Sequence, residues 1–373
     1  MGFFLSLSDE DFEKEKEVKT VFKYFPYFLF VYHLVFAWLA YDYVNRNNGD
    51  AVQYWFVGKN LYQIRWSDFL GPGTDAVKLI TYPLVVFFKM PPLWGCLFFS
   101  AISGYGFIRL WKLIKSEMVD SRLLIMAALL LVLPNAHFWT SVIGKEALLF
   151  LPMVLIAEKL YKGRYFSVIS FISFFLIAWI RPHLAFVLLA AYMIALLWKG
   201  EISRNARVGL IIAGLISVAG LYFLLEKITN ARGGLFQKIE RLYGVHNLKL
   251  RETSAYVPLE DYVYPYKLFS FYFRPLPWEK EGLYYQVVGL ENLIHIVLFL
   301  GLIYLFIRWY KNIKLKAYVV FAFLFLVFYA SMLVYGYANF GMIIRSKALA
   351  LPAVFLLLVF IIGERKPKSD FDS

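Results

Sequence analysis

Residues 175–186 read FLIAWIRPHLAF, and in this stretch an arginine, a proline and a histidine interrupt an otherwise aliphatic and aromatic run. Proline ends or kinks a helix because it has no amide hydrogen to donate. The stretch therefore predicts two apolar helices that meet at Arg181. The arginine needs a reason to be there, because a charge at membrane depth costs several kcal/mol unless it is solvated or paired.

The rest of the chain is similarly apolar. Of its 373 residues, 61% are hydrophobic, 20% are aromatic and only 17% are charged, whereas a soluble domain carries roughly 25% charged residues. Several apolar runs approach or exceed the roughly 20 residues that a helix needs to cross a bilayer. The composition therefore predicts an all-α polytopic integral membrane protein.

Hydropathy predicts about ten membrane spans. They are residues 22–41, 92–113, 121–136, 143–161, 165–180, 183–198, 206–226, 288–308, 315–336 and 342–362. The third, fifth and sixth are short for a complete crossing, which favours a broken or re-entrant course for some of them. Residues 76–90 (AVKLITYPLVVFFKM) are also short and contain a proline, so they predict a helix lying along the membrane surface.

The spans divide the chain into successive parts. These are a soluble tail (1–20), an N-terminal bundle (21–226) with an external loop (42–91), an external segment of loops and short helices (227–287), C-terminal spans (288–364) and a second tail (365–373). The mixed-charge N-terminal stretch does not resemble a cleaved signal, so the first apolar run is expected to be retained.

Lysine and arginine predict the orientation. They gather in four short connections, which are residues 109–122, 158–165, 198–207 and 308–316. All four fall on the side of both termini when ten spans are counted, and short basic loops remain in the cytoplasm. The net charge of +13 then reflects loops that face anionic lipid rather than a nucleic-acid partner. Cys96 is the only cysteine, which excludes an internal disulfide and a cysteine-based zinc cluster.

Ionisable residues collect on the opposite side, delivered by segments far apart in sequence. They are Asp50, Lys145, Glu146, Arg181, His183, Arg274, Glu279 and Arg345. Converging guanidinium groups suit phosphate or diphosphate, because they form two-pronged, charge-assisted hydrogen bonds. A neighbouring carboxylate or histidine is the kind of group that accepts a proton from an attacking hydroxyl. The pattern predicts a site for a phosphate-bearing substrate embedded in lipid, such as a polyprenyl-linked intermediate.

Several of these residues also have a purely structural interpretation. Arg181, beside a helix-ending proline, can extend its charge to the membrane interface. Lys145 and Glu146 fit the start of a capped helix, Asp50 in NNGD fits a turn, and His183 alone fits a satisfied interfacial histidine. No HExxH, Walker, dinucleotide-binding or GxSxG motif is present, and the five histidines are scattered, so no metal or other cofactor is predicted.

Four segments carry a resemblance to a known family. They are GDAVQYW (49–55), HFWTSVIGKEALLF (137–150), RPH (181–183) and GMIIRSKALALP (341–352). With the span pattern, they make most of the chain resemble the bacterial polysaccharide polymerases of the Wzy and EpsG-like kind, which are related to the GT-C glycosyltransferases. The resemblance implies a GT-C-like fold in the bacterial inner membrane and glycosyl transfer from a polyprenyl-diphosphate donor on the non-cytoplasmic face, without a nucleotide sugar. Other polysaccharide-assembly proteins are the partners that it implies.

The resemblance also implies roles for residues. Asp50 holds the place of the GT-C base, and Arg181 with His183 matches the external arginine and histidine of related polymerases. The sequence lacks a doubled acidic motif beside Asp50, so the base stays open between Asp50, His183 and Glu146. The remaining expected roles are diphosphate binding by Arg181, Arg345, Arg274 and Lys145, and stacking on sugar faces by Tyr54, Trp55 and Trp139.

Two functions of other classes stay open. A transporter or flippase for lipid-linked oligosaccharide would also need an arginine-lined cavity, but alternating access is usually built on sequence repeats, and none is evident. A membrane acyltransferase would use His183 as its base, and the further histidine expected deeper in a span is not evident. Chain lengthening of a glycan distinguishes the polymerase from both.

Overall fold

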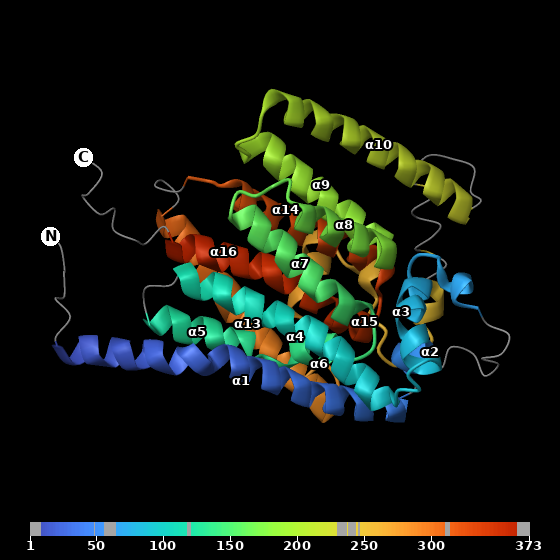
Figure 1. The fold of residues 1–373 in the computed structure, drawn as a ribbon, viewed down its shortest axis with the longest axis horizontal. Coiled ribbons are helices and arrows are strands. Elements are labelled where there is room, and N and C mark those ends of the chain that lie inside the picture. Colours follow the sequence, from blue (N-terminus) through green and yellow to red (C-terminus); the bar gives the residue numbers. More distant parts are fainter. Residues whose placement is uncertain are drawn as a thin grey trace.

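The computed structural model describes residues 9–47, 49–55, 65–117, 121–229, 237, 244, 247–309 and 314–363. Long helices dominate this part of the chain and run roughly side by side (Figure 1). The longer helices are α1 (Asp9–Asn47), α4 (Pro92–Glu117), α7 (Lys145–Tyr161), α9 (Pro182–Lys199), α10 (Arg204–Thr229), α13 (Leu283–Trp309) and α14 (Ala317–Gly336). The shorter ones are α2 (Asp50–Trp55), η1 (Trp66–Phe69), α3 (Thr74–Val86), α5 (Ser121–Leu131), α6 (Pro134–Thr140), α8 (Val168–Ile180), η2 (Leu259–Asp261), α12 (Tyr264–Phe273), α15 (Phe340–Lys347), η4 (Ala348–Ala350) and α16 (Leu351–Gly363).

Six helical stretches of the described chain are long and apolar enough to cross a membrane. They are Phe22–Asn47, Pro92–Ser116, Pro182–Lys199, Leu283–Arg308, Ala317–Gly336 and Phe340–Ile361. All six coincide with spans predicted from hydropathy, as expected for a polytopic helical membrane protein. A seventh is present if α6 and α7, which meet at an angle of 114°, form one broken span. The predicted count of ten is therefore not confirmed.

Three further predicted spans correspond to helices that are not among these six. The span predicted at 121–136 is divided, because Pro134 begins a new helix, α6, after α5 has ended at Leu131. The span predicted at 165–180 is α8, which has only 13 residues. The span predicted at 206–226 is α10, with 26 residues, although it is not among the six.

The segments outside the spans are also largely helical. The predicted surface helix at 76–90 is α3, and the loop around it holds α2 and η1. In the predicted external segment, residues 247–282 contain η2 and α12, while 230–236, 238–243 and 245–246 lie outside the described residues. Of the two predicted tails, 1–8 and 365–373 lie outside them as well, and α1 already begins at Asp9.

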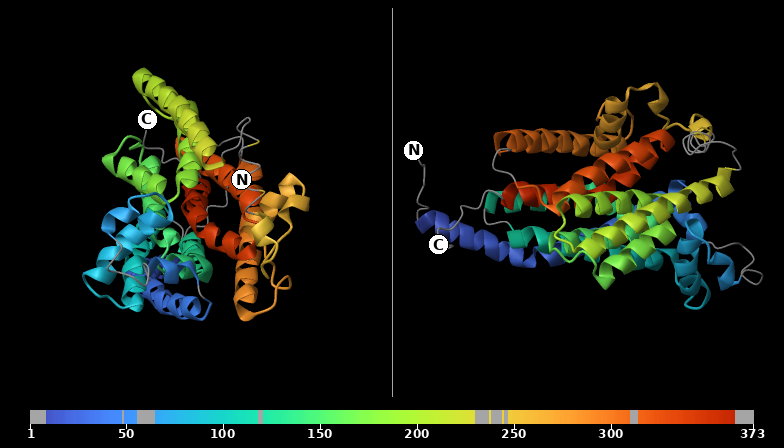
Figure 2. Two further views of the ribbon diagram at one scale, coloured as in Figure 1. Left: turned by 90° about the vertical axis from the view of Figure 1, so that its right-hand side faces the viewer. Right: turned by 90° about the horizontal axis from the view of Figure 1, so that it is seen from above.

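Large side chains from α4, α7, α14 and α16 fill the centre of the bundle. Trp111, Phe150, Phe325, Tyr329 and Phe355 are each less than 2% exposed. By contrast, α10 and α13 lie at the margins (Figure 2), and only 11% of the most apolar part of α13 is buried. An apolar helix so little covered by protein is the pattern expected where lipid is the solvent.

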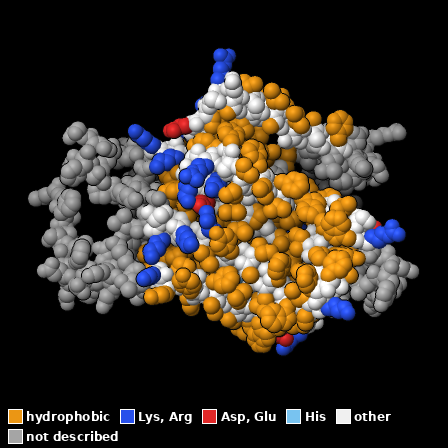
Figure 3. All heavy atoms as spheres, viewed as in Figure 1, with side chains coloured by type: hydrophobic (Ala, Val, Ile, Leu, Met, Phe, Trp, Pro, Cys, Tyr) orange, Lys and Arg blue, Asp and Glu red, His pale blue; other side chains and the backbone are white. Residues whose placement is uncertain are grey.

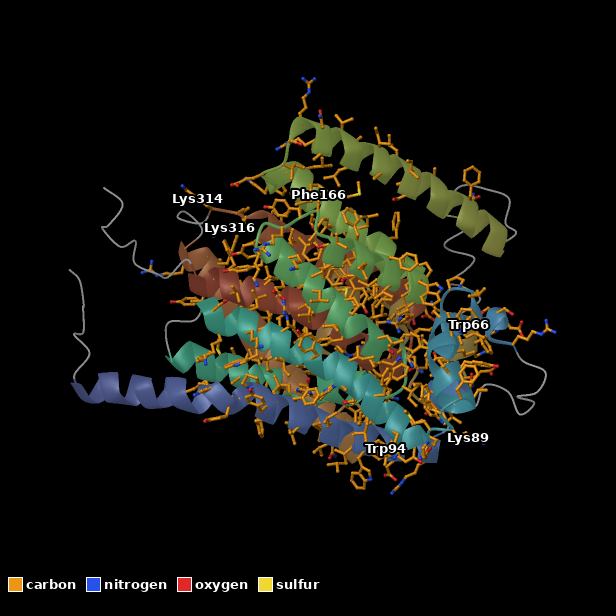
Figure 4. All side chains as sticks on the ribbon, in the orientation of Figure 1. Trp66, Lys89, Trp94, Phe166, Lys314 and Lys316 are labelled. Atoms are coloured by element: carbon orange, nitrogen blue, oxygen red, sulfur yellow. The ribbon has the colours of Figure 1, made fainter. Side chains whose placement is uncertain are left out.

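The two ends of the bundle differ in chemistry. The first residues of α1 and the last residues of α16 lie at one end, which we call the end with the termini, and α2, α3 and α15 lie at the other (Figure 1). Most of the lysine and arginine visible on the face in Figure 3 lies towards the end with the termini. Lys314 and Lys316 are at that end, and Trp66 and Lys89 are at the opposite end (Figure 4). We call the end that carries α2, α3 and α15 the distal end.

Candidate functional site

Arg181 occupies the break between α8 and α9 at the distal end. It has an extended backbone (φ −141°, ψ 83°), and its amide donates to Ile177 O of α8 (2.7 Å). Pro182 starts α9 and has no amide hydrogen, so α8 cannot continue through this point. The break holds the arginine where two helices end, and its side chain is only 4% exposed.

The carboxylate of Glu146 neutralises this arginine. Glu146 is the second residue of α7, is 4% exposed and pairs with Arg181 Nη2. Arg345 Nε, from α15, lies 3.1 Å from the same Oε1 atom, an ion-pair contact without the alignment of a hydrogen bond. A buried charge is tolerated only with such partners, so Glu146 fixes two guanidinium groups side by side.

Arg345 extends the arrangement to α2. Its Nη1 donates to Asp50 Oδ2 over 2.8 Å, and the carboxylate of Asp50 remains about half exposed. The loop that carries α2 and α3 is docked nearby, because Gly73 N donates to Trp179 O at the end of α8 (2.8 Å). Gly73 has φ +80°, a conformation that glycine adopts readily.

Lys145 completes what we call the charge cluster, consisting of Asp50, Lys145, Glu146, Arg181 and Arg345. The charges of the other four act on Lys145, yet its ammonium group makes no ion pair or hydrogen bond with any residue the structure describes. Three cations thus face two carboxylates. The cluster carries one excess positive charge, and Lys145 is the cation available to a ligand.

His183 lies at the margin of the charge cluster. It sits in the first turn of α9 with an exposed side chain, and within the described chain it makes no hydrogen bond. Arg181 and Lys145 are close enough for their charges to act on it. The structure therefore brings together Asp50, Glu146, Arg181, Arg345 and Lys145, with His183 beside them, as the sequence predicted.

Arg274 was predicted to join these residues but is placed elsewhere. It follows α12, and its Nη2 atom lies 2.5 Å from Glu279 Oε1. Its Nη1 donates to Tyr262 OH (3.1 Å), and its guanidinium stacks near the rings of Tyr266 and Phe340. Burial alone would lower the pKa of Arg274, but Glu279 and Tyr262 raise it above its ordinary value. Its charge is thus already neutralised within its own loop.

Two of the three aromatic residues predicted to stack on sugars are buried. Trp55 is 3% exposed and packs so closely on Gly95 of α4 that a Cβ atom at Gly95 would lie 2.3 Å from its ring. Tyr54 is also buried, and burial, followed by the charges of Asp50 and Glu146, raises its pKa to about 12. Trp139 is half-buried and donates to Tyr284 OH over 2.9 Å. Tyr54 and Trp55 therefore expose little ring surface, and the stacking role of all three residues stays a prediction.

Sequence reasoning did not find two further polar groups. His33 and His137 are fully buried, with their Nδ1 atoms 2.8 Å apart. Lys347 Nζ donates to Asn292 Oδ1 (2.9 Å) and to the backbone oxygen of Arg274 (2.7 Å). A polar residue inside each apolar run was the available signal, but a single run does not reveal its partner on another helix.

Neither metal-ligand geometry nor likeness to other proteins assigns a chemistry to the charge cluster. Within the residues described, no group of three or more histidine, cysteine, aspartate or glutamate side chains could hold a metal ion. Comparison of the chain with protein-family models, with curated proteins and with solved structures gives no match. The chemistry of the charge cluster must therefore support the function.

Proposed function

We propose that the charge cluster binds the diphosphate of a polyprenyl-linked glycan and that the protein is a membrane glycosyltransferase that lengthens polysaccharide chains. One observation supports this above all: two guanidinium groups and an ammonium group, with one excess positive charge, converge at the distal end of a bundle of apolar helices. Arginine pairs with phosphate oxygens in two-pronged geometry, and cations buried at membrane depth mark function.

The proposed reaction is an attack by an acceptor hydroxyl on the anomeric carbon of the donor glycan. The new carbon–oxygen bond forms as the bond to the diphosphate breaks, and the hydroxyl proton passes to a base. Arg181, Arg345 and Lys145 stabilise the negative charge that collects on the departing polyprenyl diphosphate.

Among the candidate bases, Asp50 is the best placed. Its carboxylate is half exposed and, among the residues that the structure describes, accepts a hydrogen bond from Arg345 alone, so an acceptor hydroxyl can approach it. The carboxylate of Glu146 is buried between two guanidinium groups, which suits a positioning residue rather than a base. The exposed His183 is the alternative base.

Orientation and fold are part of the proposal. The four basic connections and both termini would face the cytoplasm of a bacterial inner membrane, and the charge cluster would face the opposite side. The predicted ten-span, GT-C-like arrangement would hold if α5, α8 and α10 cross the membrane in addition to the candidate spans. Other polysaccharide-assembly proteins would then supply the donor and remove the product.

The test is an assay of purified protein with lipid-linked oligosaccharide extracted from cells that lack it. We expect longer glycan chains on a gel, and a loss of roughly 10²–10⁴-fold in turnover for Asp50→Asn. Asp75→Asn is the matched control, because Asp75 is also in the first turn of a distal helix, α3, but lies outside the charge cluster.

Three outcomes would change the proposal. Movement of the lipid across a vesicle membrane without new glycosidic bonds would indicate a transporter. Normal turnover in Asp50→Asn with an inactive His183→Ala would assign the base to His183. Unchanged oligosaccharide in both assays would contradict the proposed function.

A further inference from the structure

An apolar groove of about 370 Å³ reaches Pro182, the residue that follows Arg181. It lies between α8, α9 and α10, and the side chains that matter here are Phe174, Phe175, Pro182, Phe186 and Leu189, with Gly220 of α10 opposite them. Apart from Ser217, every residue along it is apolar or glycine. Such a lining suits a hydrocarbon chain and offers a sugar no hydrogen-bonding side chain other than Ser217.

The groove meets the break between α8 and α9 that carries Arg181. Pro182 lines the groove and directly follows Arg181. His183 is three residues before Phe186, so the two side chains neighbour each other on the surface of α9. From Pro182 to Leu189 the groove follows α9 for about 10 Å, at 1.5 Å per residue. One end of a short apolar groove therefore lies next to the buried Arg181 and the exposed imidazole of His183.

We propose that this groove holds the first isoprene units of the donor lipid, while Lys145 and His183 contact the diphosphate that is attached directly to that chain. The inference rests on the proposed function and names where its lipid lies. A single hydrocarbon chain with the phosphate at its end matches a groove that adjoins the cations without a polar interval. A phospholipid would place a glycerol unit and a second chain at that junction.

Two glycines of α10 allow a sharp test. A Cβ atom added at Gly220 or at Gly209 meets no atom within 4 Å, so a side chain can begin at either position without a backbone clash. Gly220 lines the groove and Gly209 does not. Gly220→Leu fills the groove, and Gly209→Leu is the matched control on the same helix.

The measurement is the binding of two probes, farnesyl diphosphate and inorganic diphosphate, to purified protein. We expect Gly220→Leu to lose about tenfold in affinity for farnesyl diphosphate, as the loss of contact with about two methylene groups implies. Its affinity for inorganic diphosphate should stay unchanged, and Gly209→Leu should match the unmodified chain with both probes. Lys145→Ala should weaken both probes.

Equal farnesyl diphosphate affinity in the two leucine variants would overturn the inference. So would equally strong competition by short-chain phosphatidic acid, which would mean that ordinary phospholipid occupies the groove. If a lowered unfolding temperature shows that Gly220→Leu folds poorly, the test uses Ser217→Leu instead, because Ser217 lines the same groove from α10.

The two proposals fail separately. Protein that binds farnesyl diphosphate through the groove but never lengthens a glycan would contradict the proposed function alone. If the Gly220→Leu and Gly209→Leu variants lengthen glycans equally well and bind farnesyl diphosphate equally tightly, only the inference about the groove is contradicted.

Discussion

At the residue scale, α7 carries two buried carboxylates that allow a comparison within one helix. Glu146 and Glu158 are both 5% exposed in their side chains and stand about 18 Å apart along α7. Glu158 binds Arg109 (2.5 Å) and Lys162 (2.7 Å) near the end with the termini. Arg109 is 28% exposed, whereas Arg181 is 5% exposed. The two ion pairs share their chemistry but only one adjoins the distal end.

This comparison gives a test of Arg181. Arg181→Lys keeps the charge but loses the planar guanidinium that pairs with Glu146 beside the proposed diphosphate site, so we expect normal abundance with at least a tenfold loss of glycan lengthening. Arg181→Ala should lose more, because the remaining cations then face the diphosphate without it. Arg109→Lys, the matched control, should behave as the unmodified chain.

A residue that only anchors the helix at the interface gives the opposite result. Lysine reaches the interface as well as arginine does. Full-length product from Arg181→Lys at normal protein abundance would therefore exclude the phosphate role for Arg181. Chain length on gels and abundance on blots, measured in the same cells, separate the two cases.

The sequence indicates which charged residues lie at the distal end, but it does not indicate which of them form ion pairs with one another. Asp50, Glu146, Arg181 and Arg345 come together because each stands where an apolar helix begins, breaks or ends, and these positions are visible in hydropathy. Arg274 stands in a similar position but pairs with Glu279, five residues further along the same loop. Which of two nearby carboxylates an arginine meets depends on loop geometry, which composition does not reveal.

At the element scale, the short helix α15 is held by residues 253–257, part of the segment that the sequence predicts to be external. Phe340 N donates to Ala255 O (2.9 Å), and Val257 N donates to Ala338 O (3.0 Å). Asn339 caps α15 by accepting from Met342 N and donates its amide to Thr253 Oγ1 (2.8 Å). Because α15 carries Arg345, these bonds connect the external segment to the charge cluster.

The cap of α15 gives the second prediction. Asn339→Ala removes the cap and the bond to Thr253, so we expect a loss of about 1 kcal/mol in stability together with weaker inorganic diphosphate binding. Asn339→Asp keeps the acceptor for Met342 N but loses the amide donor, so it should retain most stability and lose part of the binding. Thermal unfolding and diphosphate titration measure the two effects.

The control for this prediction is the cap of another helix. Ser167 caps α8 by accepting from Ser170 N (3.1 Å) at the opposite end of that helix from Arg181. Ser167→Ala should destabilise the protein similarly but leave diphosphate binding unchanged. Equal binding by Asn339→Ala and Ser167→Ala would show that α15 does not depend on the external segment to position Arg345.

Element boundaries were less predictable than the elements themselves. Runs of apolar residues identified six spans, because each run is long and carries few charged residues. Pro134 divided the predicted span 121–136, and the 114° bend between α6 and α7 turned the chain where hydropathy stays high. Hydropathy measures the preference for lipid or protein interior, and it carries no information about the direction in which a helix leaves a break.

At the scale of the whole molecule, the two ends of the bundle differ in how their positive charges are placed. Lysine and arginine in the loops mark the end with the termini (Figure 3), while the cations at the distal end are largely paired with carboxylates inside the bundle. Loop charges determine orientation in a membrane, and buried pairs contribute little to it. The proposed function requires the charge cluster to face away from the cytoplasm.

Cysteine labelling in intact cells tests this orientation. In a Cys96→Ser background, we expect Asn205→Cys and Lys314→Cys, at the end with the termini, to be shielded from an impermeant thiol reagent. Glu252→Cys, in the exposed external segment, should be labelled, because it lies on the side of the charge cluster. All three should react in permeabilised cells, which controls for local access. Labelling of the first two alone in intact cells would reverse the orientation, and a lipid-linked donor on the outer face would then be unable to reach Lys145 and Arg181.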